Sequence, residues 1–339
     1  MKRPRTGAPD APPRYAPAWW LPGPHLPTLW AARARRGPTV HPRAERFELP
    51  DGDFVDLAWL DAGASDTTPL VILLHGLEGG LASPYIRRAL HAIAARGWGA
   101  CLLQFRGCSG VPNRLPRSYH SGDTGDLASF VAMLRVRYPV RPLCAVGYSV
   151  GGNVLLKWLG ERGAAAPLVA AAAVSVPFDL AAAAARLARG VSRIYQAHLL
   201  ASLHAKMLAK LQRFEMPFTA RDVSTARDFR TYDERVTAPL HGFGGADDYY
   251  ARASSGPFLH RIAIPTLIVH ARDDPFLPAQ AIPRRETCAA SIELELSERG
   301  GHVGFVTDPL PGWTRPWLEQ RVVHHLVRFA GGVPVNPRN

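Results

Sequence analysis

Short apolar runs alternate with helical segments along most of this chain, and this alternation constrains the fold more than any other feature. Uninterrupted apolar runs are typical of strands whose two faces are both covered. The segments between them have helical periodicity, and the segment 83–97 has a serine N-cap, a proline at its first position and a terminal glycine. Such alternation predicts a parallel, doubly wound sheet. The runs are PLVILLHG (69–76), WGACLLQF (98–105), PLCAVGY (142–148), PLVAAAAVSVP (167–177), IPTLIVHAR (264–272) and SIELELSERG (291–300).

The residues before the first of these runs have a different character. Residues 1–45 are rich in proline and arginine, which predicts an irregular N-terminal arm, with Trp19, Trp20 and Trp30 docked on the body. Two alternating runs then flank Asp51-Gly52, and this pattern predicts a β-hairpin with a primed two-residue turn.

About ninety residues between the runs 167–177 and 264–272 break the alternation. They include LAAAAARLARG and YQAHLLASLHAKMLAKLQRF, so we expect a mostly helical insertion placed as a lid. A length of 339 residues fits one α/β domain that carries such an insertion. The predicted organisation is an arm over 1–45, a core over 46–177 and 261–331, and a lid over 178–260.

The stretch AVGYSVGGN (145–153) places Ser149 between Gly147 and Gly151, directly after an apolar run and before a helical segment. The pattern G-x-S-x-G is common by chance, but this context is that of a nucleophile elbow, a strained turn that exposes the serine hydroxyl. Serine needs a general base, and the base needs an orienting acid. We therefore interpret Ser149 as a catalytic nucleophile.

The acid and the base are expected after the serine in the chain, in that order. TLIVHARDDPFLP supplies Asp273 and Asp274, and LELSERGGHVGF supplies His302. The other candidate histidines fit less well, since His75 precedes the elbow, His270 lies inside a strand ahead of the acid, and His120 also precedes the elbow.

An oxyanion hole requires two backbone N–H groups aimed at the developing negative charge. One is expected from Val150, the residue after the nucleophile. The other is expected from Leu77 in HGLEGG, where the glycines allow close approach of the backbone.

The formal net charge is +12, but all except four of the 40 basic residues are arginines scattered along the chain. Without an arginine-rich face interleaved with aromatics, nucleic-acid binding is not expected. Contact with an anionic membrane surface is more plausible, given Arg33, Arg35 and Arg36 near the start.

Cys101, Cys108, Cys144 and Cys288 show no C-x-x-C spacing, which favours reduced thiols in a cytoplasmic protein. The first residues lack the apolar region of a signal peptide, and no apolar run is long enough to span a bilayer. No histidine–carboxylate cluster has metal-ligand spacing, so neither a metal nor a cofactor is expected.

Taken together, the motifs resemble those of the YheT-type α/β-hydrolases of bacteria, whose relatives include plant embryogenesis-associated hydrolases and animal α/β-hydrolase-domain lipases. The resemblance implies carboxylic-ester hydrolysis with Ser149, Asp274 and His302 as the triad. One departure is Pro27, where the family tends toward glutamine. Some family motifs have no evident chemical role, and they contain Arg106, His120 and Asp126. We interpret these three as structural or pocket residues. The motifs are HGLEGGLASPYIR, FRGCSGVPNRLPRSYHSGDTGDL, VGYSVGGN, VSVPFDL, ADDYY, PTLIVHARDDPF and GGHVGF.

The sequence thus predicts an α/β-hydrolase fold and a serine esterase acting on small-molecule esters with short to medium acyl chains, including monoacylglycerol-like lipids. A thioesterase or an amidase could use the same triad, because fold and triad do not separate these reactions. A hydrolase scaffold that only binds a ligand is the alternative from another class.

Overall fold

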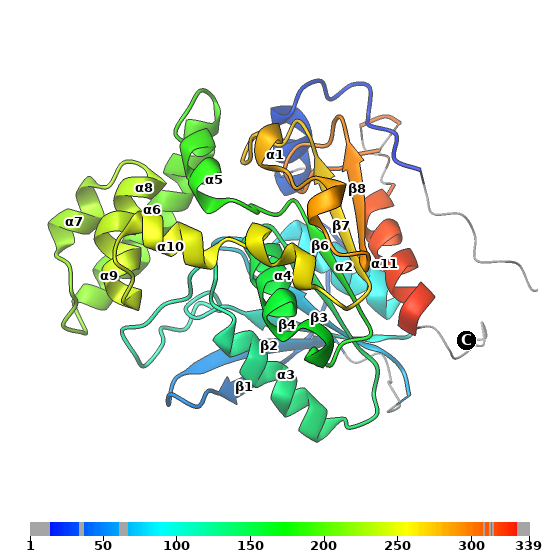
Figure 1. Cartoon of the computed structure of the whole chain (residues 1–339), viewed down its shortest axis with the longest axis horizontal. Helices are drawn as coiled ribbons and strands as arrows, with labels where there is room; N and C mark the ends of the chain where they lie inside the picture. The colour runs from blue at the N-terminus through cyan, green and yellow to red at the C-terminus, as the bar shows by residue number, and fades with distance from the viewer. Residues whose placement is uncertain are drawn as a thin grey trace, which may run out of the picture.

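The computed structural model describes residues 14–33, 37–60, 67–307, 309–311, 313 and 315–330, which are built around an eight-stranded sheet (Figure 1). The strand order is β1-β2-β4-β3-β5-β6-β7-β8, with β2 antiparallel to both neighbours and every pair from β4 to β8 parallel. The predicted, mostly parallel sheet is therefore confirmed. The strands are β1 (Arg43–Glu48), β2 (Phe54–Leu60), β3 (Leu70–Leu74), β4 (Gly99–Gln104), β5 (Leu143–Tyr148), β6 (Ala170–Val174), β7 (Thr266–Ala271) and β8 (Ile292–Ser297).

Helices cover both faces of the sheet. On one face, α2 (Pro84–Ala94) and α11 (Trp317–Ala330) pack their buried stripes on alternate residues of the central strands. On the other face, α3 (Gly125–Arg137) and α4 (Val150–Arg162) do the same. The strands read as continuous apolar runs because each of their faces is covered, as their complete burial shows.

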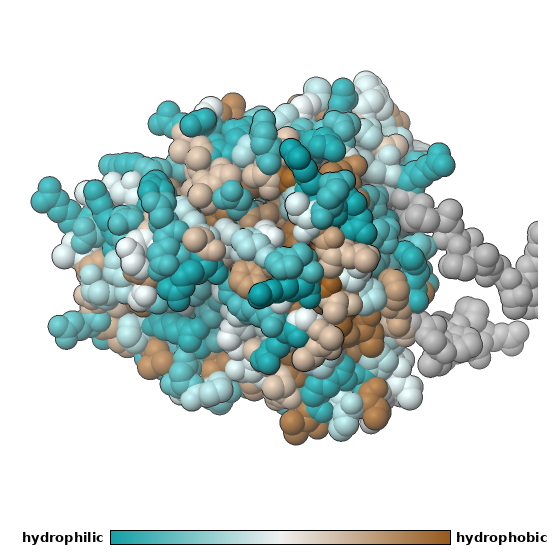
Figure 2. All heavy atoms as spheres, in the orientation of Figure 1, coloured by the Kyte–Doolittle hydropathy of each residue, from teal (hydrophilic) through white to brown (hydrophobic). Residues whose placement is uncertain are grey.

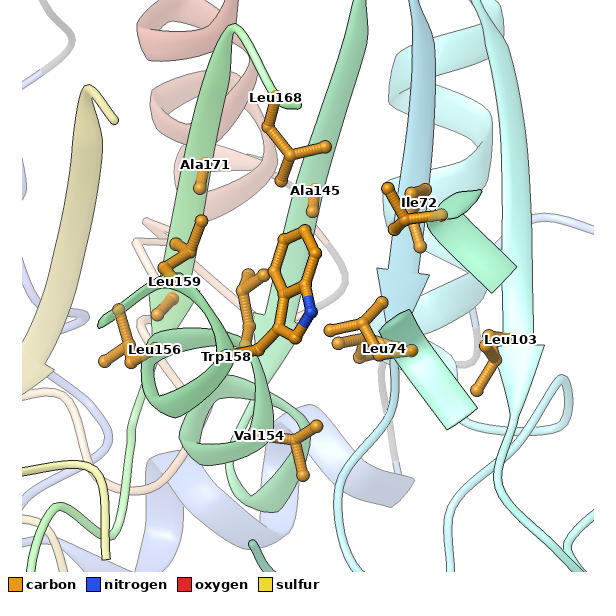
Figure 3. Packing of buried hydrophobic residues seen from close by; sticks show 14 of the residues in the cluster. Ile72, Leu74, Leu103, Ala145, Val154, Leu156, Trp158, Leu159, Leu168 and Ala171 are labelled. Carbon is orange, nitrogen blue, oxygen red and sulfur yellow. The ribbon is translucent and has the colours of Figure 1, made fainter. Parts of the chain in front are cut away.

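The helix that follows the elbow is the most buried of the four. Figure 3 shows the Trp158 ring of α4 lying over the sheet, between Ala145 of β5 and Leu74 of β3. Val154 and Leu159 pack beside it, and both are fully buried. This packing fixes the N-terminus of α4 against the carboxyl ends of β3 and β5.

The hairpin at the sheet edge is present, but its turn differs from the prediction. Leu49 N–H donates to the Asp53 carbonyl, so three residues rather than two form the loop. A type I′ turn needs positive φ at both central residues and a type II′ turn at the first, whereas within this loop only Gly52, at +83°, has it. Pro50, with its φ fixed near −65°, instead favours a turn that ends in one left-handed glycine.

The N-terminal segment is not irregular throughout, because residues His25–Arg33 form the helix α1. Trp20 and Trp30 pack edge to face, with ring centroids 4.8 Å apart, beside a small cluster that includes Val306. Trp19 remains largely exposed, although its indole N–H donates to the Pro309 carbonyl. The helix lies at the end of the sheet where β7 and β8 finish (Figure 1).

The predicted helical insertion lies between β6 and β7, and in Figure 1 most of it projects to the left of the sheet. It has its own apolar core, formed by residues such as Leu200, Met207, Val223 and Val236. Its outer surface is mostly hydrophilic on the face seen in Figure 2. The elements are α5 (Leu180–Leu187), α6 (Ser192–Leu211), α7 (Ala220–Thr225), α8 (Phe229–Tyr232), the π-helical turn η2 (Asp233–Thr237), α9 (Ala238–His241), α10 (Ala246–Ala253) and the 3-10 turn η3 (Gly256–Arg261).

Short 3-10 turns complete the structure, namely η1 (Gly163–Ala165) after α4, and η4 (Ala279–Ala281) and η5 (Arg285–Thr287) between β7 and β8. Among the helices that the structure describes, none has the length and apolar character needed to cross a lipid bilayer.

Candidate active site

Ser149 occupies the one-residue turn between β5 and α4, with φ of 52° and ψ of −121°. A non-glycine residue with positive φ is strained, and such strain is held only where the surroundings impose it. Here Ser149 N–H donates to the Val174 carbonyl of β6, and the following helix is buried along its length. The turn therefore holds the hydroxyl at the carboxyl end of the sheet, as expected for a nucleophile elbow.

The glycines around Ser149 are required by close backbone contacts. A Cβ on Gly151 would lie 2.5 Å from the His75 carbonyl oxygen, and one on Gly147 would clash with the backbone of α4. A Cβ on Gly152 would lie 2.7 Å from a methyl group of Val176. Side chains at these positions would separate α4 from the strands and move the serine.

Three residues that are far apart in the sequence meet at this turn. His302 Nε2 lies 3.0 Å from Ser149 Oγ, and His302 Nδ1 lies 2.9 Å from Asp274 Oδ2. Asp274 is buried, and its other oxygen accepts the Phe276 N–H at 2.7 Å. The geometry fits a hydroxyl that can pass its proton to an imidazole whose second nitrogen is held by a carboxylate.

The neighbouring candidates have other contacts. Asp273 accepts the Gly301 N–H at 2.9 Å, and burial raises the pKa of this carboxyl. Both ring nitrogens of His75 have hydrogen-bond partners of their own, since Nδ1 lies 2.7 Å from the Gly76 carbonyl oxygen and Nε2 accepts the Phe105 N–H at 3.0 Å.

The other two histidines also lie outside the hydrogen-bonded set. His270 is buried behind Asp274, with Nε2 3.8 Å from a carboxylate oxygen, and burial lowers its pKa to about 4. His120 packs against His241 with ring centroids 4.7 Å apart, on the wall of a separate cavity.

The His302 loop is held by groups that the sequence analysis did not identify. The His302 N–H donates to Thr28 Oγ1 of α1 at 2.8 Å, and the same hydroxyl donates to the Pro24 carbonyl. Phe276 stacks on the imidazole ring at a centroid distance of 3.9 Å and an angle of 2°. The N-terminal segment thus helps to orient the histidine, and no local sequence signal indicates this contact.

The turn after β3 carries Leu77, one of the two expected oxyanion donors. The N–H groups beside it are occupied, since Gly76 donates to the Tyr85 hydroxyl and Glu78 to the Tyr119 hydroxyl. Within the described part of the chain, neither Leu77 N–H nor Val150 N–H donates to a protein group. Leu77 and Val150 both line the cavity beside Ser149.

Glu78 is a second residue that the sequence analysis passed over. Its φ is +54°, and its nearly buried carboxylate accepts from the Tyr119 hydroxyl, from Ser202 Oγ at 2.5 Å and from Lys206 Nζ at 2.8 Å. Ser202 and Lys206 belong to α6 of the insertion. The strained turn is therefore tied to the insertion by a charged, hydrogen-bonded carboxylate.

Two adjoining cavities lie between the sheet and the insertion. The smaller, of about 80 Å³, contains Ser149, Asp274 and His302 and has a mostly apolar wall. The larger, of about 320 Å³, has a more polar wall and shares five lining residues with the first. The apolar wall of the smaller cavity is formed by Pro177, Leu180, Ala183, Ala184, Leu187, Leu199 and Leu277. The shared residues are Leu77, Ser121, Phe229, Asp233 and Tyr249.

Arg106 and Asp126 form a buried ion pair, with both guanidinium–carboxylate distances at 2.7 Å. Arg106 also lies 2.8 Å from Asp51, which ties the loop after β4 to the hairpin turn. Arg106 and His120 line the larger cavity.

Burial raises the pKa of the Cys108 thiol to about 11, so this cysteine is poorly suited to act as a nucleophile. Among the described residues, no group of three or more histidine, cysteine or carboxylate side chains could hold a metal ion.

Comparisons with known proteins agree with this arrangement. A family model described as the alpha/beta hydrolase fold matches residues 69–309. The YheT protein of Escherichia coli (strain K12), provisionally named an esterase, is 42% identical over 308 residues, which is 90% of each chain. Phospholipase ABHD3 of Mus musculus is 32% identical over 83% of this chain and 73% of its own length. The Pyrococcus furiosus esterase Pf2001 has a similar fold, with a TM-score of 0.54 at 17% identity, over 95% of this chain and all of that chain.

The fold and the serine turn define an α/β hydrolase, and the chain belongs to the α/β-hydrolase family, in the group that includes YheT. It is an enzyme of the esterase and lipase type. The resemblance noted in the sequence motifs is therefore confirmed.

Proposed function

We propose that this enzyme cleaves carboxylic esters of short to medium acyl chains through a covalent acyl-enzyme. The observation that carries the proposal is the position of His302, whose two ring nitrogens lie 3.0 Å from the Ser149 hydroxyl and 2.9 Å from the Asp274 carboxylate. A serine hydroxyl at its ordinary pKa is a weak nucleophile, and such a pair of contacts activates it.

In the proposed reaction, Ser149 Oγ attacks the ester carbonyl while His302 Nε2 takes its proton. Asp274 holds the imidazole in the required tautomer and stabilises the imidazolium. The N–H groups of Leu77 and Val150 bind the oxyanion of the tetrahedral intermediate. His302 then gives its proton to the leaving alcohol. In the second step His302 takes a proton from water as the water oxygen attacks the acyl carbon, and the bond to Ser149 Oγ breaks while His302 returns the proton to that oxygen and the acid is released.

The proposed acyl site is the apolar part of the smaller cavity. Its wall includes Ala184 and Leu187 of α5 and Leu199 of α6, so the insertion acts as a lid that excludes water from the serine. A cavity of about 80 Å³ favours short and medium chains over long ones. The relatives are named an esterase and a phospholipase, which supports an ester substrate and makes small lipid esters, including monoacylglycerol-like ones, reasonable candidates.

The nucleophile is tested by Ser149→Ala. We expect turnover of p-nitrophenyl butyrate to fall about a millionfold and labelling by a fluorophosphonate probe to be lost, with an unchanged melting temperature. Cys108→Ala is the matched control and should label normally. Loss of labelling in the cysteine variant with retention in the serine variant would refute the assignment.

The substrate class is tested with a matched panel of esters, thioesters and amides that share one acyl group. We expect the ester to give the largest kcat/KM. A thioester or an amide cleaved faster than the ester would replace the proposed ester specificity while leaving the triad assignment intact.

The acyl site is tested by Ala184→Phe, which fills the apolar wall, against Ala185→Phe on the exposed side of the same helix. The first change should lower kcat/KM for an octanoate ester at least tenfold and for an acetate ester much less, because the longer chain loses its site. The second should change neither value. A chain-length profile that Ala184→Phe leaves unchanged would put the acyl group elsewhere.

A further inference from the structure

Six large apolar side chains are exposed at the end of the molecule that holds the active site. Their exposed fractions range from 46% for Leu26 to 75% for Trp19. Large apolar residues exposed singly are ordinary, but a group of them on one face marks an interaction surface. We call this group the entrance face; it consists of Trp19, Leu26, Val191, Ile194, Leu310 and Trp313.

Side-chain contacts join neighbouring segments of this face. His25 of α1 meets the hydroxyl of Tyr195 at 3.1 Å, so the start of α1, which carries Leu26, lies beside the start of α6, which carries Ile194 and directly follows Val191. The Trp19 indole donates to the Pro309 carbonyl at 3.1 Å, which places it beside Leu310. In Figure 1, α1 and the loop between α5 and α6 lie at the same end of the molecule, at the top of the view.

The entrance face adjoins the catalytic residues. The Tyr195 ring packs on Phe276 with centroids 5.0 Å apart, and Phe276 stacks on His302. Leu187, which lines the cavity beside Ser149, ends α5 just before the loop that carries Val191. A surface that covers this face would therefore lie over the active site.

Two of the three segments that carry this face hold no acidic residue in the sequence around them. Residues 11–44 and 180–214 contain no aspartate or glutamate, whereas both segments contain several arginines. Arg33, Arg189 and Arg193 are exposed, and within the described residues none of them pairs with a carboxylate. Burial and then the charge of Arg186 lower the pKa of His25, against a smaller opposing effect of Asp273. Of the arginines noted early in the chain, Arg35 and Arg36 lie outside the described residues.

We propose that the entrance face docks on the surface of an anionic lipid bilayer. Tryptophan is enriched at the boundary between headgroups and acyl chains, and exposed apolar residues enter this layer beside basic ones. An anionic surface complements the acid-free segments, and each arginine near it strengthens binding about fivefold. The inference concerns binding and does not depend on the proposed ester hydrolysis.

The test is co-sedimentation of the full chain with vesicles of phosphatidylglycerol mixed with phosphatidylcholine, and with vesicles of phosphatidylcholine alone. We expect binding to the anionic vesicles, weakened by added salt, and much less binding to the neutral ones. The Ser149→Ala protein should bind equally well, which separates docking from catalysis. Absence of binding to anionic vesicles at low salt would overturn the proposal.

Two pairs of variants identify the surface. The double substitution Val191→Asp with Ile194→Asp should weaken vesicle binding at least tenfold. The control is Val136→Asp with Val140→Asp, at the far end of α3, where the two side chains are 83% and 79% exposed. Since all four positions are exposed, the variants should fold, as melting curves would check.

Equal loss of vesicle binding in the two double variants would refute the assignment of this face. Light scattering on the wild type tests the other occupant, a second copy of the chain. A dimer that the Val191→Asp, Ile194→Asp protein fails to form, without vesicle binding by the wild type, would assign the face to self-association instead.

Discussion

Asp233 provides a test of how burial shapes the stability of the insertion. Its carboxyl group lies in the π-helical turn η2, on the wall shared by the two cavities, and accepts hydrogen bonds from Thr237 Oγ1 at 2.7 Å and the Tyr250 hydroxyl at 2.8 Å. Burial outweighs these bonds and raises the pKa from 3.8 to about 7. The folded state therefore binds the proton more tightly than the unfolded chain does.

The sign of the pH dependence follows from this shift. Well below pH 3.8 the group is protonated in both states and does not change the free energy of unfolding. Between pH 4 and 7 the unfolded chain ionises first, so stability falls as the pH rises. Above pH 7 the loss is complete, and a shift of this size corresponds to about 4 kcal/mol.

The substitution Asp233→Asn removes this titration and keeps the shape of the side chain. We expect the variant to match the wild type near about pH 3 and to exceed its free energy of unfolding by about 4 kcal/mol at about pH 8. Urea unfolding of both proteins across this range measures the difference directly. Asp247→Asn is the control, because this exposed carboxylate pairs with Arg230, which lowers its pKa, and its removal should have a small effect of opposite sign. A wild-type to variant difference that stays constant or shrinks with pH would refute the reasoning.

Three further substitutions test the site. Asp274→Asn should lower kcat by up to about ten thousandfold and Asp273→Asn far less; the reverse order would move the acid by one residue. Gly151→Ala should lower the free energy of unfolding in urea by about 1–3 kcal/mol or more, because the added Cβ would meet a backbone carbonyl. Gly125→Ala is the control: its added Cβ has its closest contact at 3.7 Å, so its free energy of unfolding should differ from the wild type by less than about 0.5 kcal/mol. Glu78→Gln should lower kcat at least about tenfold with little change in KM, because a misplaced oxyanion turn weakens the stabilisation of the transition state and not the binding of substrate. A KM that rises by the same factor would instead assign Glu78 to substrate binding.

The parts of the site that the sequence predicted are those determined by local pattern and chain order. The turn at Ser149 could be recognised because its glycines are needed at fixed offsets from the serine. Asp274 and His302 could be placed because the two parallel strands that precede them end at the same edge of the sheet as β5. The mostly parallel pairing of the strands follows from the alternation of apolar runs and helices.

The parts that escaped prediction depend on contacts between distant segments. Thr28 reaches the His302 N–H across 274 positions, and nothing in the Pro-rich N-terminal segment signals this bond. Glu78 stands among glycines in HGLEGG, a pattern that indicates close approach of the backbone and carries no sign of the side-chain contacts with α6. The Asp51-Gly52 pair predicts a primed turn, whereas Pro50 before it favours the three-residue loop that the structure has. These residues act through geometry that only the folded chain provides.

The helix α6 shows how such geometry joins functions that look separate in the sequence. Its residues Tyr195, Leu199, Ser202 and Lys206 are spaced by four, three and four positions, which puts them on one face. Along that face, Tyr195 packs on Phe276 beside the histidine, Leu199 lines the cavity at the serine, and Ser202 and Lys206 hold the carboxylate next to Leu77. A displacement of α6 would therefore alter the support of the proposed base, the proposed acyl site and the proposed oxyanion turn together. Because α6 begins on the entrance face, a surface bound there would act on the very helix that organises the site.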